Sequence, residues 1–343
     1  MAKSNTRLEL TWIGKENRPK LEPRILIEDP EKSYHAAHRV TDNDLFDNRL
    51  IFGDNLLALK ALEQEFTGKV KCIYIDPPFN TGSAFEHYDD GIEHSLWLNL
   101  MYQRLQVLYT LLRNDGVLWL HLDDNEAAYT KVLLDEIFGR SNYRNTITVR
   151  ANSPFGFKHT SGNIFKSGNT LLVYSKSTNF RYNSVFIERG YDPAYKFVLK
   201  DRKKDYINWE WTPIGESIAK KLGYLTSREA KKSLGEEGYL ACISEYAITN
   251  ADRVFRTASV TGGARQKRQE TLTKSAAERE KVFRHPNDDM DYYFIGGERV
   301  LFYNERLVEI DNQLLPGEAI TDIWTDISWE GIAKEGGVQF PKG

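Results

Sequence analysis

The sequence predicts an α/β fold in which a largely parallel sheet is joined to a second domain of mixed α and β character. Two apolar, strand-like runs at 70–75 and 117–122 alternate with helix-like segments, and each run ends in acidic residues. After about residue 180, Lys and Arg are interleaved with aromatic residues, which indicates a different kind of domain. The chain has 343 residues, 41% of them hydrophobic, which is enough for two such domains.

The expected elements of the first domain follow in order along 46–180. A short strand at 50–55 ends in a Gly-Asp-Asn turn, and Asn55 is placed to cap a helix over 56–66. The strand at 70–75 then completes a β-α-β unit, which favours parallel pairing. The remaining predicted elements are a helix over 96–112, a turn at 113–116, the strand 117–122, a helix capped by Asp124 or Asn125 that runs to Phe138, and strands near 145–149 and 170–175.

The rest of the chain divides into three parts. Residues 1–45 are polar, contain three prolines and are expected to form a peripheral arm. Residues 181–315 are expected to form the second domain, with a helical segment at 218–224 and a hairpin at 292–303 that turns at Gly296-Gly297. Residues 316–343 are interpreted as the start of a return into the first domain.

Positive charge is concentrated in the second domain. Residues 196–284 hold 19 Lys and Arg against 12 Asp and Glu, although the whole chain has a net charge of −3. This segment is therefore a candidate phosphate-facing surface, and a solvated charged face is the alternative. Within it Arg265, Lys267 and Arg268 follow two glycines, an exposed and flexible setting suited to DNA phosphate contacts that position the duplex without reading its sequence.

Several classes of protein are excluded by composition. The chain has two cysteines, Cys72 and Cys242, which form neither a disulfide framework nor a metal-ligand spacing, so no metal site is expected. The first residues lack the apolar core of a secretion signal, and no apolar run approaches the length of a membrane span. These observations indicate a cytoplasmic protein without membrane association.

The tetrapeptide Asp76-Pro77-Pro78-Phe79 is the strongest candidate site. It follows directly on the apolar strand 70–75, and open α/β sheets bind ligands outside the carboxyl ends of their strands. The two prolines fix φ and remove two backbone donors, so that a carboxylate, bare carbonyl oxygens and an aromatic ring face the crevice. These groups suit an exocyclic amine on a flat base that has been flipped out of a duplex. The alternative is a simple turn that leaves a strand.

The context of the tetrapeptide resembles a known family. The run Ile75-Asp76-Pro77-Pro78-Phe79-Asn80-Thr81-Gly82, the upstream Gly53-Asp54-Asn55-Leu56 and the later Leu122-Asp123-Asp124-Asn125-Glu126 resemble amino-group DNA methyltransferases, in particular modification subunits of type III restriction systems. The resemblance covers most of 45–180. It implies a Rossmann-like methyltransferase sheet with permuted motif order, into which a mixed α+β target-recognition domain is inserted.

The resemblance also implies a reaction and roles for individual residues. The reaction is methyl transfer from S-adenosylmethionine to the exocyclic amine of a flipped base, with adenine N6 preferred because the motif begins with aspartate. Asp76 and the Pro77 carbonyl would accept hydrogen bonds from the amine, and Phe79 would stack on the base. Asp54 and Asp123, together with Asp76, would lie on the cofactor side, with a turn residue and a helix cap as the respective alternatives for Asp54 and Asp123.

The implied partners are double-stranded DNA, a restriction subunit and a second copy of the chain. The family's Phe-x-Gly-x-Gly loop for the cofactor is not found in the sequence. We therefore expect the sheet to be incomplete and the chain to be weakly active or inactive alone, either because it is truncated or because a second polypeptide supplies the remainder. A non-catalytic DNA-binding component of a restriction-modification or phage-defence system is the alternative function.

Overall fold

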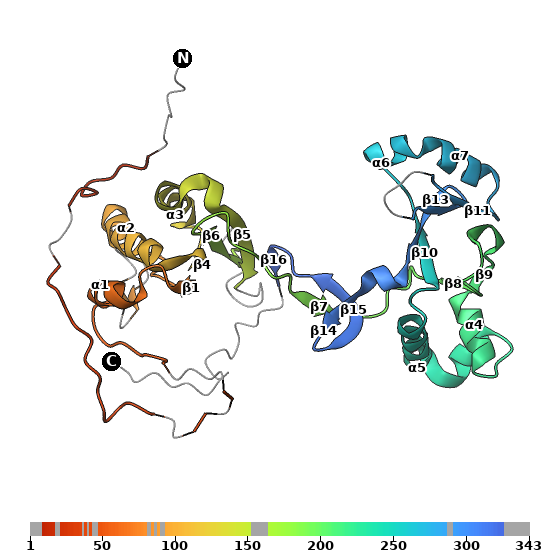
Figure 1. Cartoon of the computed structure of the whole chain (residues 1–343), viewed down its shortest axis with the longest axis horizontal. Coiled ribbons are helices and arrows are strands. Elements are labelled where there is room, and N and C mark those ends of the chain that lie inside the picture. Colours follow the sequence, from red (N-terminus) through yellow and green to blue (C-terminus); the bar gives the residue numbers. More distant parts are fainter. Residues whose placement is uncertain are drawn as a thin grey trace, which may run out of the picture. The chain divides into compact units, whose positions relative to one another are not determined.

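The chain folds into two compact units, Met1–Asn183 with Thr321–Gly343 and Ser184–Ile320, where the sequence suggested limits near 181 and 315 (Figure 1). Each unit has its own hydrophobic core. The computed structural model describes residues 9–17, 21–35, 38–39, 41–42, 47–80, 84–85, 88–89, 93–151, 164–286 and 291–325. Thr81 and Gly82, which complete the family-like run, and most of the predicted return over 316–343 lie outside these residues.

The first unit is built on a five-stranded sheet, which confirms the predicted α/β class. Its strand order is β1 (Val70–Ile75), β4 (Leu112–Leu122), β6 (Gly168–Ser175), β5 (Tyr143–Arg150) and β16 (Ile323–Trp324). β1 is parallel to β4 and β5 is parallel to β16, whereas β6 is antiparallel to both of its neighbours. The sheet is therefore mixed: the β1–β4 and β5–β16 pairs have the expected parallel form, and the antiparallel β6 lies between them. A separate short hairpin pairs β2 (Ala84–Phe85) with β3 (Tyr88–Asp89).

Side-chain alternation along β4 divides the sheet into two faces. Leu118, Leu120 and Leu122 belong to the core that also contains Trp97 and Leu105 of helix α2 (His94–Leu111). The same core includes residues of α3 (Ala127–Leu134), which continues as one π-helical turn, Asp135–Gly139. The intervening residues of β4 face the other way and pack with β5, β6 and Trp324. Helix α1 (Asn55–Phe66) packs on α2.

The strand predicted at 50–55 is wrong. These residues pair with no strand of the described chain, and the side chains of Leu50 and Phe52 are 92% and 102% exposed. Helix α1 does follow, but its cap is Asp54 rather than Asn55, because Asp54 Oδ1 accepts hydrogen bonds from the main-chain N–H groups of Leu56 and Leu57, both at 3.0 Å. Leu50 and Phe52 of this run are thus exposed rather than paired in the sheet.

Two other predicted boundaries shift. β4 begins at Leu112, so the predicted turn at 113–116 lies inside the strand, where the register with β1 is irregular. Gly116 fits there because a Cβ would lie 2.9 Å from the Val70 carbonyl oxygen. The helix expected to be capped by Asp124 or Asn125 begins at Ala127 instead, with Glu126 at the cap position, while Asp124 pairs with Lys166 at 2.6 Å.

β1 is the last strand at one edge of the sheet as far as the structure describes it. Its side chains on the face away from α2 are open to solvent: Tyr74 is 60% exposed, and Cys72, which lies inside an apolar run, is also exposed. One face of the strand that leads into the tetrapeptide is thus exposed to solvent.

The described part of the N-terminal arm is anchored by a buried cation. Lys15 is 6% exposed, and its Nζ lies 2.9 Å from carboxylate oxygens of Glu9 and Glu136. Trp12 packs edge-on against Tyr102 of α2, with ring centroids 5.5 Å apart, and the ammonium group lies over both rings. The arm is thereby tied to the helical side of the sheet.

The second unit is built on a six-stranded sheet. Its order is β11 (Val282–Arg284), β12 (Tyr293–Ile295), β13 (Glu298–Phe302), β10 (Val254–Ala258), β8 (Phe197–Leu199) and β9 (Trp211–Pro213), with antiparallel pairing throughout. A smaller sheet joins β14 (Leu307–Ile310), β15 (Gln313–Ala319) and β7 (Phe186–Glu188). The helices are α4 (Ile214–Lys221), α5 (Ser227–Thr249), α6 (Gly262–Lys267) and α7 (Gln269–Ala277).

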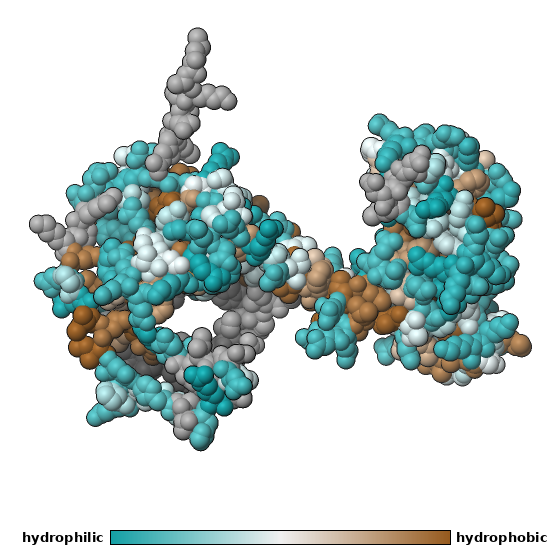
Figure 2. Space-filling model, in the orientation of Figure 1, coloured by the Kyte–Doolittle hydropathy of each residue, from teal (hydrophilic) through white to brown (hydrophobic). Residues whose placement is uncertain are grey.

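The predicted hairpin near 292–303 is confirmed. β12 and β13 pair through Phe294 and Arg299, and Gly296 and Gly297 form the turn with φ values of 60° and 83°. Both angles lie in the left-handed region, which explains why glycine occupies both positions. The visible surface of this unit is mostly hydrophilic, as Figure 2 shows. No helix in the part of the chain that the structure describes is both long and apolar enough to cross a membrane.

We predict that Leu105→Ala lowers the free energy of unfolding of the first unit by about 2–5 kcal/mol, because it removes methyl groups from a fully packed site. Leu105 is 0% exposed and lies at the centre of α2. Leu96→Ala on the same helix is the matched control, since Leu96 is 59% exposed, and should change stability by about 0.5 kcal/mol or less. Urea unfolding followed by circular dichroism measures both, and equal losses would contradict the assigned core.

Candidate active site

The site begins with a carboxylate at the end of β1. Ile75 is paired with Leu120, so the next residues in register are Asp76 and His121. Asp76 Oδ1 lies 3.1 Å from His121 Nδ1. The Asp76 side chain is 52% exposed and that of His121 only 4%. One carboxylate oxygen is therefore held by a buried partner, while the group as a whole remains accessible.

His121 links the carboxylate to two further side chains. Its Nε2 lies 3.1 Å from Asn169 Nδ2 at the start of β6. Its ring makes an edge-to-face contact with Phe79, with centroids 5.1 Å apart and planes at 90°. Three neighbouring strands and the end of the tetrapeptide thus meet at this histidine.

The two proline carbonyls have different surroundings. The Trp97 indole Nε1–H donates to the Pro78 carbonyl over 2.8 Å, and Trp97 is 0% exposed on the first turn of α2. Among the described residues, no hydrogen bond ends on the Pro77 carbonyl. Pro77 therefore offers the main-chain acceptor beside Asp76, and the Trp97–Pro78 contact fixes the direction of the chain between them.

A second buried carboxylate holds the residue after the tetrapeptide. Asn80 has φ of 60°, a left-handed conformation that asparagine tolerates better than most residues. Its Nδ2 donates to Glu126 Oε1 over 2.7 Å. The His94 Nδ1 lies 3.0 Å from the same carboxylate, whose side chain is 3% exposed. Glu126 thereby couples the loop to the start of α2.

The carboxylates expected on the cofactor side have structural partners. Asp54 caps α1, and its other oxygen faces Arg104 at 3.7 Å while the side chain stays 54% exposed. Asp123 accepts hydrogen bonds from both the main-chain N–H and the Nδ2 of Asn125, at 2.9 and 2.8 Å. Since α1 ends where β1 begins, Asp54 lies at the same end of the β-α unit as Asp76. Asp54 is therefore the cap of α1 rather than a turn residue, and Asp123 holds a tight turn at Asn125 rather than capping α3.

The negative charge of Asp76 affects the pKa of a nearby tyrosine, Tyr74. Partial burial, together with the nearby Asp76 carboxylate, raises the pKa of Tyr74 above its usual range. The Tyr74 hydroxyl therefore stays protonated and uncharged near neutral pH. It provides a polar group on an otherwise aromatic side chain.

The three basic residues proposed for DNA contact lie in two environments. Arg265 and Lys267 are exposed on α6, which replaces the expected flexible loop. Arg268 is 7% exposed: its guanidinium lies 3.8 Å from the centre of the Tyr292 ring, and it donates to the Ala264 carbonyl. The expectation that Arg268 is exposed is therefore incorrect, because cation–π packing turns it inward.

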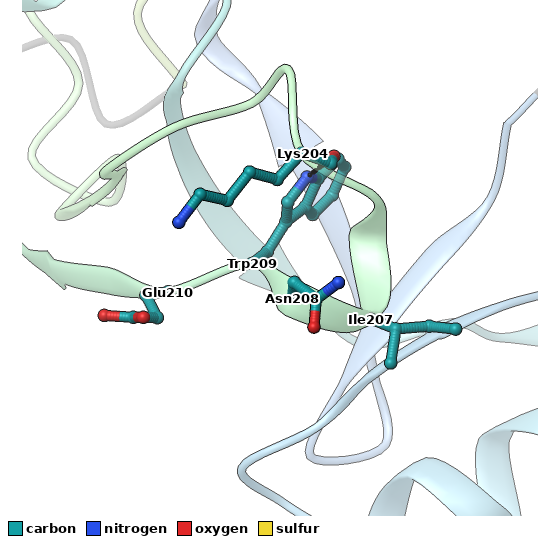
Figure 3. A pocket seen from close by; sticks show the side chains of 5 residues that line it. All are labelled: Lys204, Ile207, Asn208, Trp209 and Glu210. Carbon is teal, nitrogen blue, oxygen red and sulfur yellow. Dashed lines mark hydrogen bonds between the residues drawn. The ribbon is translucent and has the colours of Figure 1, made fainter.

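The second unit also carries a shallow surface hollow, lined by Lys204, Ile207, Asn208, Trp209 and Glu210 (Figure 3). The Trp209 indole donates to the Lys204 carbonyl and is largely buried. Figure 3 shows that the side chains of Lys204, Glu210 and Ile207 do not converge on a common point. The hollow lacks the convergent polar groups of the site at Asp76.

The residues that support the tetrapeptide were not singled out from the sequence. His121 carried a usable signal, because a polar residue interrupts an apolar strand at the same register as Asp76. Trp97, Glu126 and Asn169 carried none, since their contacts depend on how α2, α3 and β6 pack against the site.

A family model described as DNA methylase, for N6 and N4 methyltransferases, matches residues 70–288, which is more than half of the chain. The chain belongs to this DNA methylase family. The match begins with β1, includes the tetrapeptide and β4, and extends into the second unit. The family assignment and the mixed α/β sheet agree with the fold class expected from the sequence.

Known members of the family are similar over much of this chain. The protein named "Probable type III restriction-modification enzyme HindVI Mod subunit" from Haemophilus influenzae is 28% identical over 92% of this chain and 45% of its own length. The type III restriction-modification enzyme EcoP15I Mod subunit from Escherichia coli is 28% identical over 69% of this chain and 43% of its own length. The chain thus spans less than half the length of these relatives.

Among solved structures, a putative DNA modification methylase from Thermus thermophilus complexed with S-adenosyl-L-methionine matches 37% of this chain and 53% of its own chain. The sequence identity is 15% and the TM-score 0.27.

We predict that Glu126→Ala destabilises the first unit by about 1–3 kcal/mol, because it removes a buried carboxylate that accepts a hydrogen bond from the partly buried Asn80 amide. Glu126→Gln is the control, since its amide oxygen can still accept from Asn80 at similar volume, and it should lose less. Chemical unfolding of the two variants in parallel provides the comparison. An Ala variant as stable as the Gln variant would show that the carboxylate does not hold the loop.

Proposed function

We propose that this chain carries the base-capturing part of a site-specific DNA methyltransferase that acts on the exocyclic amine of a flipped base, adenine N6 in particular. The observation that carries the proposal is the end of β1, where a half-exposed carboxylate and a proline carbonyl lie next to each other in a fixed loop. Membership of the DNA methylase family supports the reaction class.

The acceptors suit an amine with two hydrogens. Asp76 and the Pro77 carbonyl each accept one N–H, which favours a pyramidal nitrogen with its lone pair directed out of the base plane. Little basicity is required of the carboxylate, because the amine loses its proton after the new N–C bond has formed. Alignment supplies most of the catalysis, and effects of this kind are sensitive to displacements of about 1 Å.

The aromatic ring of Phe79 gives the base a surface. Phe79 is partly buried against the core under α2, and the edge-to-face contact with His121 fixes its plane. Stacking of a base on such a ring contributes about 1–3 kcal/mol and tolerates any base, so the amine contacts supply the selection.

S-adenosylmethionine is the proposed methyl donor. Its ammonium and hydroxyl groups fit the acidic end of the first unit, where Asp54 remains more than half exposed beside Arg104. Asp54, Asp76 and Asp123 are the proposed cofactor-side residues, and Asp123 would contribute a carboxylate that Asn125 holds in place after β4. No metal is required for this chemistry.

DNA is the proposed substrate, held through the second unit. Arg265 and Lys267 contact phosphates in this proposal, while Arg268 braces the end of α6 against Tyr292. By analogy with the Mod subunits that the chain resembles, a restriction subunit and a second copy of the chain are the proposed protein partners, and the cytoplasm is the proposed location.

We predict that Asp76→Ala lowers incorporation of labelled methyl groups from S-adenosylmethionine into duplex DNA by at least about 10²-fold, since a misaligned amine loses a factor of this size. Asp76→Asn is the isosteric comparison: it keeps one oxygen acceptor and loses the charge, and should fall between wild type and Ala. A filter-binding methylation assay checks both. Undiminished incorporation by the Ala variant would refute the role of Asp76.

We predict that the double variant Arg265→Gln/Lys267→Gln binds duplex DNA of any sequence more weakly. The negative slope of log K against log[salt] should decrease in magnitude by about 2, one for each phosphate contact. Lys274→Gln on α7 is the control, because Lys274 is an exposed lysine on the next helix that the proposal does not place at the DNA. Fluorescence anisotropy over a range of salt concentrations measures the slope. An unchanged slope in the double variant would remove α6 from the DNA interface.

A further inference from the structure

His121 is the buried centre of a chain of hydrogen bonds that crosses three strands. It lies on β4 at 3% exposure, between Asp76 at the end of β1 and Asn169 at the start of β6. The two contacts use different ring nitrogens, Nδ1 for Asp76 and Nε2 for Asn169, each at 3.1 Å. A residue in this position can fix the carboxylate without touching a bound base.

The partners determine which nitrogen carries the proton. A carboxylate oxygen only accepts, so His121 Nδ1 donates to Asp76 Oδ1. The Asn169 amide nitrogen donates, so Nε2 is the acceptor and carries no hydrogen. Both contacts are satisfied by one neutral form of the imidazole, the Nδ1–H tautomer, because the hydrogen bond of one ring nitrogen sets the state of the other.

Strand pairing explains why the three side chains meet. His121 is opposite Leu171 in the antiparallel β4–β6 pair, which makes Asn169 a diagonal neighbour on the same face. Asp76 is beside His121 in the parallel β1–β4 pair. This face is the one turned away from α2, since Leu118 and Leu120 occupy the other. The geometry is therefore set by the sheet itself, which is more rigid than a loop.

The contact with His121 makes the two oxygens of the Asp76 carboxylate inequivalent. Oδ1 is held by His121, whereas Asp76 as a whole remains 52% exposed. The oxygen that is not bonded to the imidazole is thus the one that can accept from an incoming amine. His121 also meets Phe79 edge-to-face, so the same ring orients both the acceptor and the stacking surface.

We propose that His121, held by Asn169 as the Nδ1–H tautomer, is a positioning residue that fixes Asp76 and Phe79 for base capture. The proposal rests on the proposed function for its consequence in methyl transfer, but the hydrogen-bond chain itself can be tested without DNA or cofactor. In this role His121 takes no proton from the amine, because its Nε2 is turned to Asn169 and its Nδ1 is already protonated.

The first experiment measures the tautomer in the whole chain. The chain has 7 histidines, so long-range ¹H–¹⁵N correlation spectra of protein labelled at histidine are tractable, and the signals missing in His121→Asn identify His121. We expect a protonated Nδ1 and a bare Nε2 at neutral pH. Asp76→Ala and Asn169→Ala should each shift His121 towards the Nε2–H form. A wild-type Nε2–H tautomer, or a tautomer unchanged in both variants, would overturn the proposal.

The second experiment separates positioning from folding. An asparagine at 121 can place an amide N–H near the position of Nδ1–H, whereas phenylalanine fills the space without a donor. We expect His121→Phe to lower kcat for methyl transfer by about 10²-fold with KM for S-adenosylmethionine within about 3-fold, and His121→Asn to recover at least about 10-fold of that loss. Wild-type kcat in His121→Phe, or equal losses in the two variants, would also overturn it.

The two experiments distinguish a failure of the His121 proposal from a failure of the proposed function. If wild-type protein binds DNA but transfers no methyl group, the tautomer spectra alone decide whether His121 bridges Asp76 and Asn169. If methyl transfer depends on Asp76 but not on His121, the reaction stands and the positioning role is refuted.

Discussion

Two consecutive prolines impose the constraint on which the site depends. A loop built from Pro77 and Pro78 has no main-chain N–H at either position, so it cannot be held by the backbone hydrogen bonds that usually shape a turn. Side chains do this instead: an indole on α2 binds the second proline carbonyl, a buried carboxylate holds Asn80, and an imidazole on β4 holds Asp76. Each comes from a different part of the unit. The loop therefore adopts this conformation only when α2, the start of α3 and the sheet are packed together.

The sequence could predict the parts of the site that are local. The strand 70–75, its acidic end and the hairpin at Gly296-Gly297 depend on apolar runs and on turn residues, which short windows contain. It could not predict that 50–55 remains unpaired, because pairing depends on a neighbouring strand rather than on the residues themselves. It also could not identify Trp97 and Glu126 as residues that support the loop. Their partners, Pro78 and Asn80, are far from them in the sequence, and periodic patterns do not predict such contacts.

The sequence also predicts only part of how charge is distributed on the second unit. A count of Lys and Arg treats all three residues after Gly263 alike, yet the structure turns Arg268 inward onto Tyr292 and leaves Arg265 and Lys267 outside. Arginine is suited to such packing because its guanidinium is flat and weakly hydrated. Local net charge therefore identifies a region that can face phosphates, but it does not distinguish its exposed members from its buried ones.

The position of β1 at the border of the described sheet has a consequence for how the protein behaves in solution. The outer side of this strand presents main-chain donors and acceptors, and Leu50, Phe52 and Tyr74 add exposed apolar surface in the same unit. Strand borders of this kind are templates for pairing with other chains unless they are covered or charged. Lys71 is the one charged side chain within β1 itself, and it is drawn to Asp115 at 2.8 Å. Among the described residues, this border is therefore open to pairing with a further strand, from the same chain or from another one.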